Sequence, residues 1–130
     1  LRAAPQVLGA VADAIDHVRS VVENELGGIT DNPLVFDEKI LAGGNFHGMP
    51  LAISMDLLRM VICHIAGIAE RRVFWVLSGV DGQNPVTPFL AHDPGLHSGL
   101  MIAQYTAAAL CNELQVLAHP ASPANISTEG

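Results

Sequence analysis

The chain has 130 residues, half of them apolar and only 15% charged, and its formal net charge is −7. This length corresponds to one domain or part of one, and the negative charge excludes a nucleic-acid-binding module, which needs a basic surface. No uninterrupted apolar run reaches the roughly 18 residues of a membrane span, and no signal-peptide pattern is recognised near Leu1. Cys63 and Cys111 are not spaced as a metal motif, so we expect reduced thiols in a cytoplasmic protein.

The first predicted element is a helix from Pro5 to about Leu26. Proline suits the first helical turn, and Gly27-Gly28 is a typical helix end. Between them, apolar residues recur every three or four positions and form one stripe of an amphipathic helix. The stripe consists of Val7, Val11, Ile15, Val18, Val22 and Leu26.

Residues 29–42 are predicted to be irregular. Asp31-Asn32-Pro33 has the chemistry of a turn, because the aspartate and asparagine side chains bond to nearby backbone and Pro33 keeps Asn32 out of a helix. Two short runs, Leu34–Phe36 and Lys39–Leu41, flank Asp37-Glu38 and predict a small exposed β-hairpin.

The next stretch, Gly43-Gly44-Asn45-Phe46-His47-Gly48, holds three glycines in six residues and cannot be good helix. We call it the glycine loop. It presents an amide, an aromatic ring and an imidazole, which is a plausible arrangement for binding a ligand. The alternative is a connector between two helices whose Phe46 fills the core. The spacing alone favours the connector.

Two further helices are predicted, from Leu51 to about Ser78 and from about Ser98 to Ala118, with His119-Pro120 as the stop. The expected fold is all-α: a bundle of three long helices joined by irregular loops, with residues 1–130 as one helical segment. The apolar excess predicts helix faces that pack on other helices. The abrupt start and the polar end at 125–130 lead us to expect an internal piece of a longer protein.

The residue patterns taken one by one indicate no metal site and no nucleophile. Histidines 92 and 97 share a loop with Asp93, but no zinc-type spacing occurs, and no metal site is predicted. Cys63 and His64 are helix neighbours that point about 100° apart, which argues against a nucleophile–base pair.

Several charged residues are expected to form ion pairs. Asp56 and Arg59 are three residues apart and can pair along their helix. Glu70 can pair with a facing arginine inside the bundle, but a structural ion pair or a solvated face is favoured for it. Arg2 stands just before a helix, where its planar guanidinium can hold a carboxylate.

Taken together, eight short sequence words in order resemble the aromatic amino acid ammonia-lyase family, and the histidine ammonia-lyase branch most of all. The words cover nearly the whole chain. They are Arg2 with Pro5-Gln6; Thr30-Asp31-Asn32-Pro33-Leu34; the glycine loop; Met55-Asp56; Glu70-Arg71-Arg72; Gly95-Leu96 with Ser98-Gly99; Gln104-Tyr105-Thr106-Ala107-Ala108-Ala109-Leu110; and His119-Pro120-Ala121-Ser122.

The resemblance implies a carbon–nitrogen lyase that removes ammonia from an α-amino acid, here L-histidine, and gives the unsaturated acid urocanate. It implies an electrophilic methylidene-imidazolone made from an internal Ala-Ser-Gly tripeptide, and no metal. It also implies a homotetramer with a core of long helices, in which each active site draws residues from several subunits. The small-molecule partner would be the amino acid substrate.

The resemblance also implies site residues. Arg2 looks like the arginine that grips the substrate carboxylate, and Phe46 like the aromatic residue that lines the pocket. Asn32 and Asn45 are similar to asparagines that support or shape the site. Glu129 is similar to an acidic position near the substrate amine. None of these is identified as the catalytic group.

The 130 residues contain no Ala-Ser-Gly, so we expect the chain to be inactive alone. The sequence leaves other functions open. Phenylalanine or tyrosine ammonia-lyases and 2,3-aminomutases share the implied scaffold. A protein of another class is also possible, namely a helical oligomerisation module or remnant without chemistry.

Overall fold

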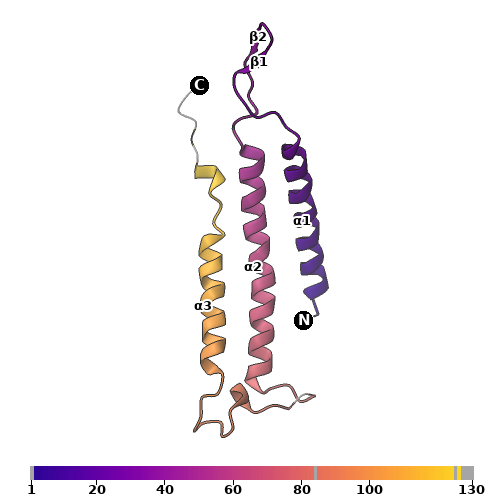
Figure 1. Ribbon diagram of the computed structural model, residues 1–130. Coiled ribbons are helices and arrows are strands. Elements are labelled where there is room, and N and C mark those ends of the chain that lie inside the picture. The colour runs from indigo at the N-terminus through magenta and orange to yellow at the C-terminus, as the bar shows by residue number, and fades with distance from the viewer. Residues whose placement is uncertain (1, 84, 125, 127–130) are drawn as a thin grey trace.

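The structure is a computed structural model that describes residues 2–83, 85–124 and 126. Three long helices dominate it: α1 (Ala4–Leu26), α2 (Met49–Ser78) and α3 (Met101–Leu117). Helix α2 lies between the other two and packs on both, and neighbouring helices run in opposite directions (Figure 1). The prediction of an all-α bundle of three long helices joined by loops is confirmed.

The helix ends follow the sequence signals. Helix α1 has Pro5 in its first turn and ends at Leu26, with Gly27 as its C-cap. Helix α2 is flanked by Gly48 (φ 73°) and Gly79 (φ 69°), both in the left-handed region that glycine adopts without a steric penalty. With 30 residues, α2 is about 45 Å long and spans the whole bundle.

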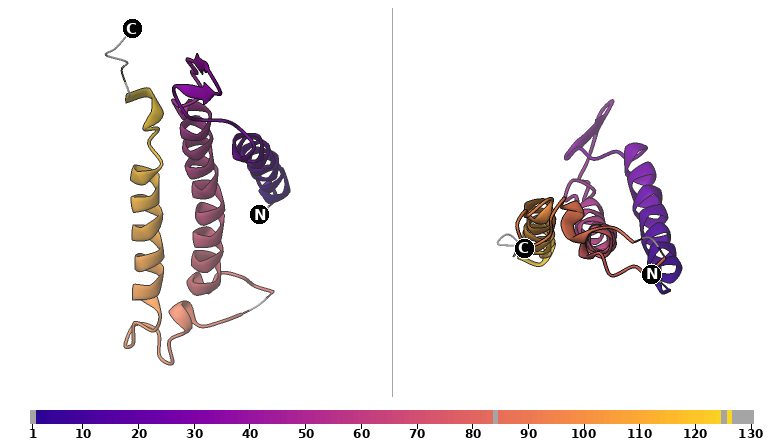
Figure 2. Two further views of the ribbon diagram at one scale, coloured as in Figure 1. Left: turned by 45° about the horizontal axis from the view of Figure 1, so that its top comes forward. Right: turned by 90° about the horizontal axis from the view of Figure 1, so that it is seen from below.

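The predicted hairpin is present. Strands β1 (Leu34–Phe36) and β2 (Lys39–Leu41) pair antiparallel, with Leu34 opposite Leu41 and Phe36 opposite Lys39. The hairpin projects beyond the ends of α1 and α2 (Figures 1 and 2). The glycine loop follows β2 and leads into α2. The Asn32–Pro33 peptide bond is cis.

Two short 3₁₀ helices lie at opposite ends of α3, and both pack on α2. The first, η1 (Pro88–Leu90), belongs to the connection between α2 and α3. The second, η2 (Ser122–Ala124), follows the His119-Pro120 stop. The chain after α3 therefore returns to the end of α2 that carries the glycine loop (Figure 2).

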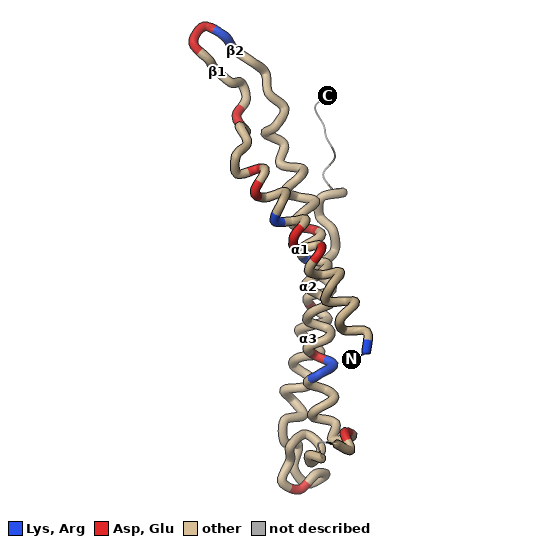
Figure 3. The backbone as a smooth tube through the Cα atoms, turned by 90° about the vertical axis from the view of Figure 1, so that its right-hand side faces the viewer, with Lys and Arg blue, Asp and Glu red and all other residues tan. Residues whose placement is uncertain are grey.

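Few of the described side chains are buried, and the buried ones are as often polar as apolar. The apolar ones are Val11, Val18, Leu77 and Ala91, and the polar ones are Ser54, Asp56, Glu70 and Gln104. Many large apolar side chains on all three helices remain exposed. Charges gather on α1 and the hairpin, whereas α2 and α3 carry few along most of their length (Figure 3). These exposed faces are what the apolar composition predicted.

By length and composition alone, α2 would also be apolar enough to cross a membrane. We interpret it as a bundle helix because it carries two buried carboxylates, Asp56 and Glu70, that bond to groups elsewhere in the chain. Its two long sides are also occupied by α1 and α3.

Candidate functional site

The glycine loop is held by two asparagine side chains. The Asn32 side-chain oxygen accepts the Gly43 N–H at 3.0 Å, and the Asn45 side-chain amide donates to the Ile29 carbonyl at 3.2 Å. A Cβ on Gly43 would lie 3.3 Å from the Asp31 carbonyl oxygen, so the backbone passes close there. The structure thus brings Asn32, Asn45 and the glycine loop together, with both asparagines bonded to backbone.

Phe46 does not fill a core among the described residues, although the connector interpretation placed its side chain there. Its ring is 58% exposed at the end of the bundle. His47, next to it, is also exposed. A Cβ added to Gly44 would meet nothing within 4 Å, so the backbone beside Phe46 faces open space. The loop therefore presents an aromatic ring and a bare backbone to whatever approaches this end of α2.

Arg2 lies at the other end of α1, beside the second half of α2 (Figure 1). It directly precedes α1, it is exposed, and no ion pair or hydrogen bond of its side chain is found among the described residues. Helix α1 separates Arg2 from the glycine loop, and its 23 residues correspond to about 35 Å. The structure does not bring Arg2 and Phe46 of one chain together, because an amino acid substrate is far shorter than this distance.

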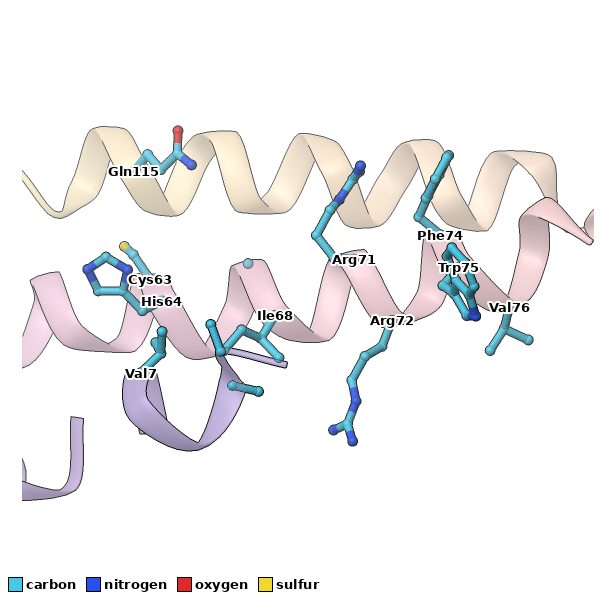
Figure 4. Close-up of a pocket in the computed structure, with 13 residues that line it drawn as sticks. Val7, Cys63, His64, Ile68, Arg71, Arg72, Phe74, Trp75, Val76 and Gln115 are labelled. Atoms are coloured by element: carbon cyan, nitrogen blue, oxygen red, sulfur yellow. The ribbon is translucent and has the colours of Figure 1, made fainter. Parts of the chain in front are cut away.

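An open groove of about 1060 Å³ runs along the Arg2 end, between the first turns of α1 and the second half of α2. We call it the α1–α2 groove. Its walls include Val7, Ile68 and Trp75 (Figure 4). Its lining is mainly apolar, with the guanidinium of Arg72 as one of the few charged groups.

Asp56 is a buried carboxylate that joins α2 to the chain after α3. Its oxygens accept the Ser122 N–H at 2.8 Å and the Ala121 N–H at 3.0 Å, and they bond to the Arg59 guanidinium. Hydrogen bonds from the Ser122 hydroxyl, the Ser122 N–H and the Ala121 N–H hold the pKa of the Asp56 carboxyl far below its usual range. The predicted Asp56–Arg59 pair is confirmed.

Glu70 is the second buried carboxylate of α2, and its main partner is its neighbour. Arg71 donates to both Glu70 oxygens, at 2.5 and 2.6 Å, and Gln104 of α3 donates to one of them at 3.3 Å. The Arg71 hydrogen bonds lower the pKa of Glu70, and the same bonds raise the pKa of Arg71. Arg71 also lies over the Phe74 ring at 4.6 Å. Glu70 therefore forms the structural ion pair of the two predicted alternatives, and its partner is the adjacent arginine and not a facing one.

The remaining candidates are dispersed. The Nδ1 atoms of His92 and His97 lie 2.9 and 4.0 Å from an Asp93 oxygen, and all three side chains are exposed. Within the described part of the chain, no group of three or more histidine, cysteine or acidic side chains could hold a metal ion. Glu129 lies outside the described residues.

Sequence reasoning missed the partners of Asp56 in the segment after α3. Backbone N–H groups exist at every residue except proline, so no sequence pattern marks the two that Asp56 binds. The only signal was an aspartate in the first third of an apolar helix, a position where a carboxylate needs hydrogen-bond donors.

Comparison with known proteins identifies the family. A sequence model described as aromatic amino acid lyase matches residues 1–130. The chain is 49% identical to histidine ammonia-lyase of Treponema denticola over 133 aligned residues, which cover all of this chain and 26% of that protein. It is 46% identical to a probable histidine ammonia-lyase of Thermoplasma acidophilum, with coverage of 98% and 25%. The chain thus spans about a quarter of the length of the curated relatives it matches.

Solved structures give the same result. Tyrosine aminomutase from Streptomyces globisporus superposes with a TM-score of 0.86 at 40% identity, over all of this chain and 25% of that one. Histidine ammonia-lyase from Trypanosoma cruzi superposes with a TM-score of 0.84 at 41% identity, over 99% of this chain and 26% of that one. With the family model matching every residue and the helical fold shared, the chain belongs to the aromatic amino acid lyase family.

Proposed function

We propose that this chain is part of an amino acid ammonia-lyase that converts L-histidine to urocanate and ammonia. The observation that carries the proposal is the identity of up to 49% with histidine ammonia-lyases along the whole chain. The two groups that fit an aromatic amino acid substrate are the exposed Phe46 and Arg2, whose side chain has no bonded partner among the described residues.

Arg2 supplies the carboxylate contact. A guanidinium presents two parallel N–H groups that match the two oxygens of a carboxylate, and such bidentate bonds are short and strong. Arg2 is exposed and, among the described residues, has no acidic partner that competes for it. It therefore orients the α-carboxylate, while Phe46 packs against the substrate side chain.

The glycine loop suits the family's methylidene-imidazolone. Phe46 offers an exposed ring, and Gly44 has open space where a side chain would stand, so a flat electrophilic group can approach this loop closely. When present, that group supplies the electron sink that makes loss of ammonia feasible. In this proposal it is formed by an Ala-Ser-Gly segment outside the 130 residues, and no metal takes part.

The separation of Arg2 from Phe46 supports a site shared between copies of the chain. One copy would contribute Arg2 and another would contribute Phe46, because the length of α1 lies between them within one copy. The exposed apolar faces of the three helices are suited to such an assembly. We propose a cytoplasmic homotetramer.

A second candidate is a 2,3-aminomutase or a lyase for phenylalanine or tyrosine. This candidate is supported by the TM-score of 0.86 with a tyrosine aminomutase at 40% identity. An aminomutase moves the amino group to the neighbouring carbon and returns a β-amino acid, whereas a lyase releases ammonia. The two activities therefore differ in products that are easily measured.

The decisive experiment uses the full-length gene product with L-histidine, L-phenylalanine and L-tyrosine in separate reactions. We expect released ammonia and the near-ultraviolet absorbance of a conjugated acid with L-histidine. A β-amino acid detected by chiral chromatography would establish the second candidate instead. A protein that assembles but turns over none of the three would be a non-catalytic helical module.

An arginine variant tests the assigned contact. Arg2→Gln removes the carboxylate partner and should raise KM roughly 10- to 100-fold, since each factor of ten corresponds to about 1.4 kcal/mol. Arg19→Gln is the control, because Arg19 is an exposed arginine of α1 that pairs with Asp16. Equal KM values for the two variants would overturn the assignment of Arg2.

The 130-residue chain without the rest of the protein is expected to be inactive, because it contains no Ala-Ser-Gly. The same absorbance measurement applies. Any rise that depends on the purified chain would contradict this expectation.

A further inference from the structure

Asp56 is the most extensively bonded side chain among the described residues that the proposed reaction does not use. Its residue is only 4% exposed. Its oxygens bond to the N–H groups of Ala121 and Ser122, which lie 65 and 66 residues further along the chain. A buried carboxylate that is bonded to a distant segment fixes that segment in space.

Arg59 holds the other side of the same connection. One of its nitrogens bonds to Asp56, and the other donates to the Leu117 carbonyl oxygen at 3.4 Å. Leu117 is the last residue of α3, where carbonyl groups lack partners within the helix. The Asp56–Arg59 pair therefore binds the chain just before and just after the His119-Pro120 stop.

The place of this pair connects it to the proposed site. Asp56 is eight residues after Gly48, which corresponds to about 12 Å along α2. Phe46 lies three residues before the start of α2, and η2 packs on α2 with its first residue, Ser122, bonded to Asp56. Both the glycine loop and residues 119–124 thus lie at one end of α2, although more than 70 residues separate them in sequence (Figures 1 and 2).

We propose that Asp56 is a positioning residue of the active site: it fixes residues 119–124 relative to Phe46, so that the two segments form adjoining walls of the substrate pocket. The proposal rests on the proposed ammonia-lyase function. Asp56 does not touch the substrate. It acts through the backbone of Ala121 and Ser122.

A charge on Asp56 is needed for this role. An ionised carboxylate has two oxygens that accept several N–H groups at once, and such bonds are stronger than those of a neutral amide. Asparagine keeps the size of the side chain but offers one accepting oxygen and an NH₂ group that faces other donors. Asp56→Asn therefore loosens residues 119–124 and leaves α2 intact.

The chain offers a matched control. Asp16 and Arg19 of α1 form a second aspartate–arginine pair with the same three-residue spacing, and both side chains are more than 60% exposed. Asp16→Asn makes the same chemical change and removes the same charge, but no other segment is bonded to Asp16 among the described residues. A comparison of Asp56→Asn with Asp16→Asn therefore distinguishes the effect of releasing the bonded segment from the effect of losing one negative charge.

The experiment measures two quantities on the full-length protein. The first is amide hydrogen exchange of Ala121 and Ser122 compared with amides in the middle of α2. The second is KM and kcat per folded enzyme for L-histidine, with the folded fraction taken from circular dichroism. Asp56→Glu, which restores the charge on a longer side chain, is included as a partial rescue.

We expect Asp56→Asn to speed exchange at Ala121 and Ser122 roughly tenfold or more, with α2 amides unchanged. We expect KM to rise roughly tenfold, because a displaced pocket wall weakens substrate binding, while kcat falls less. Asp56→Glu should recover part of the KM change, and Asp16→Asn should change neither quantity.

Three results would contradict the proposal, and each identifies a different cause. If Asp56→Asn lowers only the folded fraction and leaves KM unchanged, Asp56 is purely structural and the positioning role is overturned. If KM rises without faster exchange at Ala121 and Ser122, Asp56 acts by another route and the proposal fails. If the unaltered protein deaminates none of the three amino acids, the proposed function itself fails and the positioning role with it.

Discussion

The two ends of helix α3 are held by different chemistry. Before α3, the chain is held by close backbone packing: Gly99 has φ 51°, and a Cβ there would lie 2.3 Å from the Phe89 carbonyl oxygen. That same oxygen accepts the Leu100 N–H at 2.8 Å. After α3, the chain is held by a buried charge, the Asp56 carboxylate, on the N–H groups of Ala121 and Ser122.

The difference matters because the glycine contact and the carboxylate hydrogen bonds respond to different perturbations. A close backbone contact at a glycine is insensitive to pH and is destroyed by any added side chain. The hydrogen bonds of a buried carboxylate are strong only while the carboxylate is ionised, so they depend on pH. Each end of α3 should therefore fail under a condition that leaves the other end intact.

The largest effect is expected at the glycine end. Gly99→Val adds a branched side chain where φ is positive and where the Phe89 oxygen leaves no space. The strain and the clash together should lower the free energy of unfolding by about 3 kcal/mol or more. Urea denaturation of the variant measures this value.

Gly82→Val is the control for that substitution. Gly82 belongs to the same connection between α2 and α3, yet a Cβ there would meet nothing within 4 Å, and no positive φ is found for it. We expect a change within about 0.5 kcal/mol. If both valine variants are equally destabilised, close packing at Gly99 is not what holds this end.

The second effect concerns pH at the carboxylate end. The pKa of Asp56 is lowered in the folded chain from its ordinary value of 3.8, so folding favours the ionised form. Its contribution to stability is therefore complete above about pH 4 and is lost as the pH falls through the folded-state pKa. The difference in unfolding free energy between the unaltered protein and Asp56→Asn should narrow as the pH falls below 3.8.

The glycine end supplies the contrast for the pH measurement. The difference in unfolding free energy between the unaltered protein and Gly99→Val should stay constant over the same pH range, because no titratable group takes part in the Phe89–Gly99 contact. Urea denaturation at pH 6, 4 and below 3.8 compares the two variants. If the unfolding free-energy difference for Gly99→Val narrows as much as the one for Asp56→Asn, acid acts on the whole fold and not on Asp56.

The third effect lies between the two ends of α3. Gln104, only 8% exposed, donates to Glu70 at 3.3 Å, but Glu70 keeps both hydrogen bonds from Arg71 without it. Gln104→Ala should therefore cost about 1 kcal/mol of unfolding free energy, the usual net value of one hydrogen bond. Gln115→Ala, at an exposed position of the same helix, is the control. A cost at Gln104 of 3 kcal/mol or more would show that Gln104, and not Arg71, is the main partner of Glu70.

The helices could be predicted from the sequence because their signals are local. The three-to-four-residue apolar spacing and the glycine and proline stops placed α1 and α2 within a few residues of their observed ends. The hairpin followed in the same way from two short runs on either side of Asp37-Glu38. The predicted third helix, 98–118, was slightly too long, because Gly99 belongs to the packed connection and α3 begins at Met101.

The role of the site residues in binding substrate stays a prediction, but their structural surroundings were visible in part. Local sequence words pointed to Asn32 and Asn45, whose side chains bond to backbone within 16 residues in sequence. The distance between Arg2 and Phe46 was not visible, because it follows from the length and direction of α1. The bonds of Asp56 were not visible either, because they depend on how α3 returns the chain to α2.

The smallest effect is expected at the Asp16–Arg19 pair, and it tests whether burial explains the contrast with Asp56. The two pairs have the same residue types and spacing, but the Asp16 and Arg19 atoms are 3.6 Å apart with both side chains largely in solvent. Such surface pairs contribute less than about 0.5 kcal/mol and weaken further in salt. Asp16→Asn should therefore leave the urea midpoint unchanged within error at low and high salt. A loss as large as that of Asp56→Asn would mean that removing one negative charge, and not releasing Ala121 and Ser122, destabilises the protein.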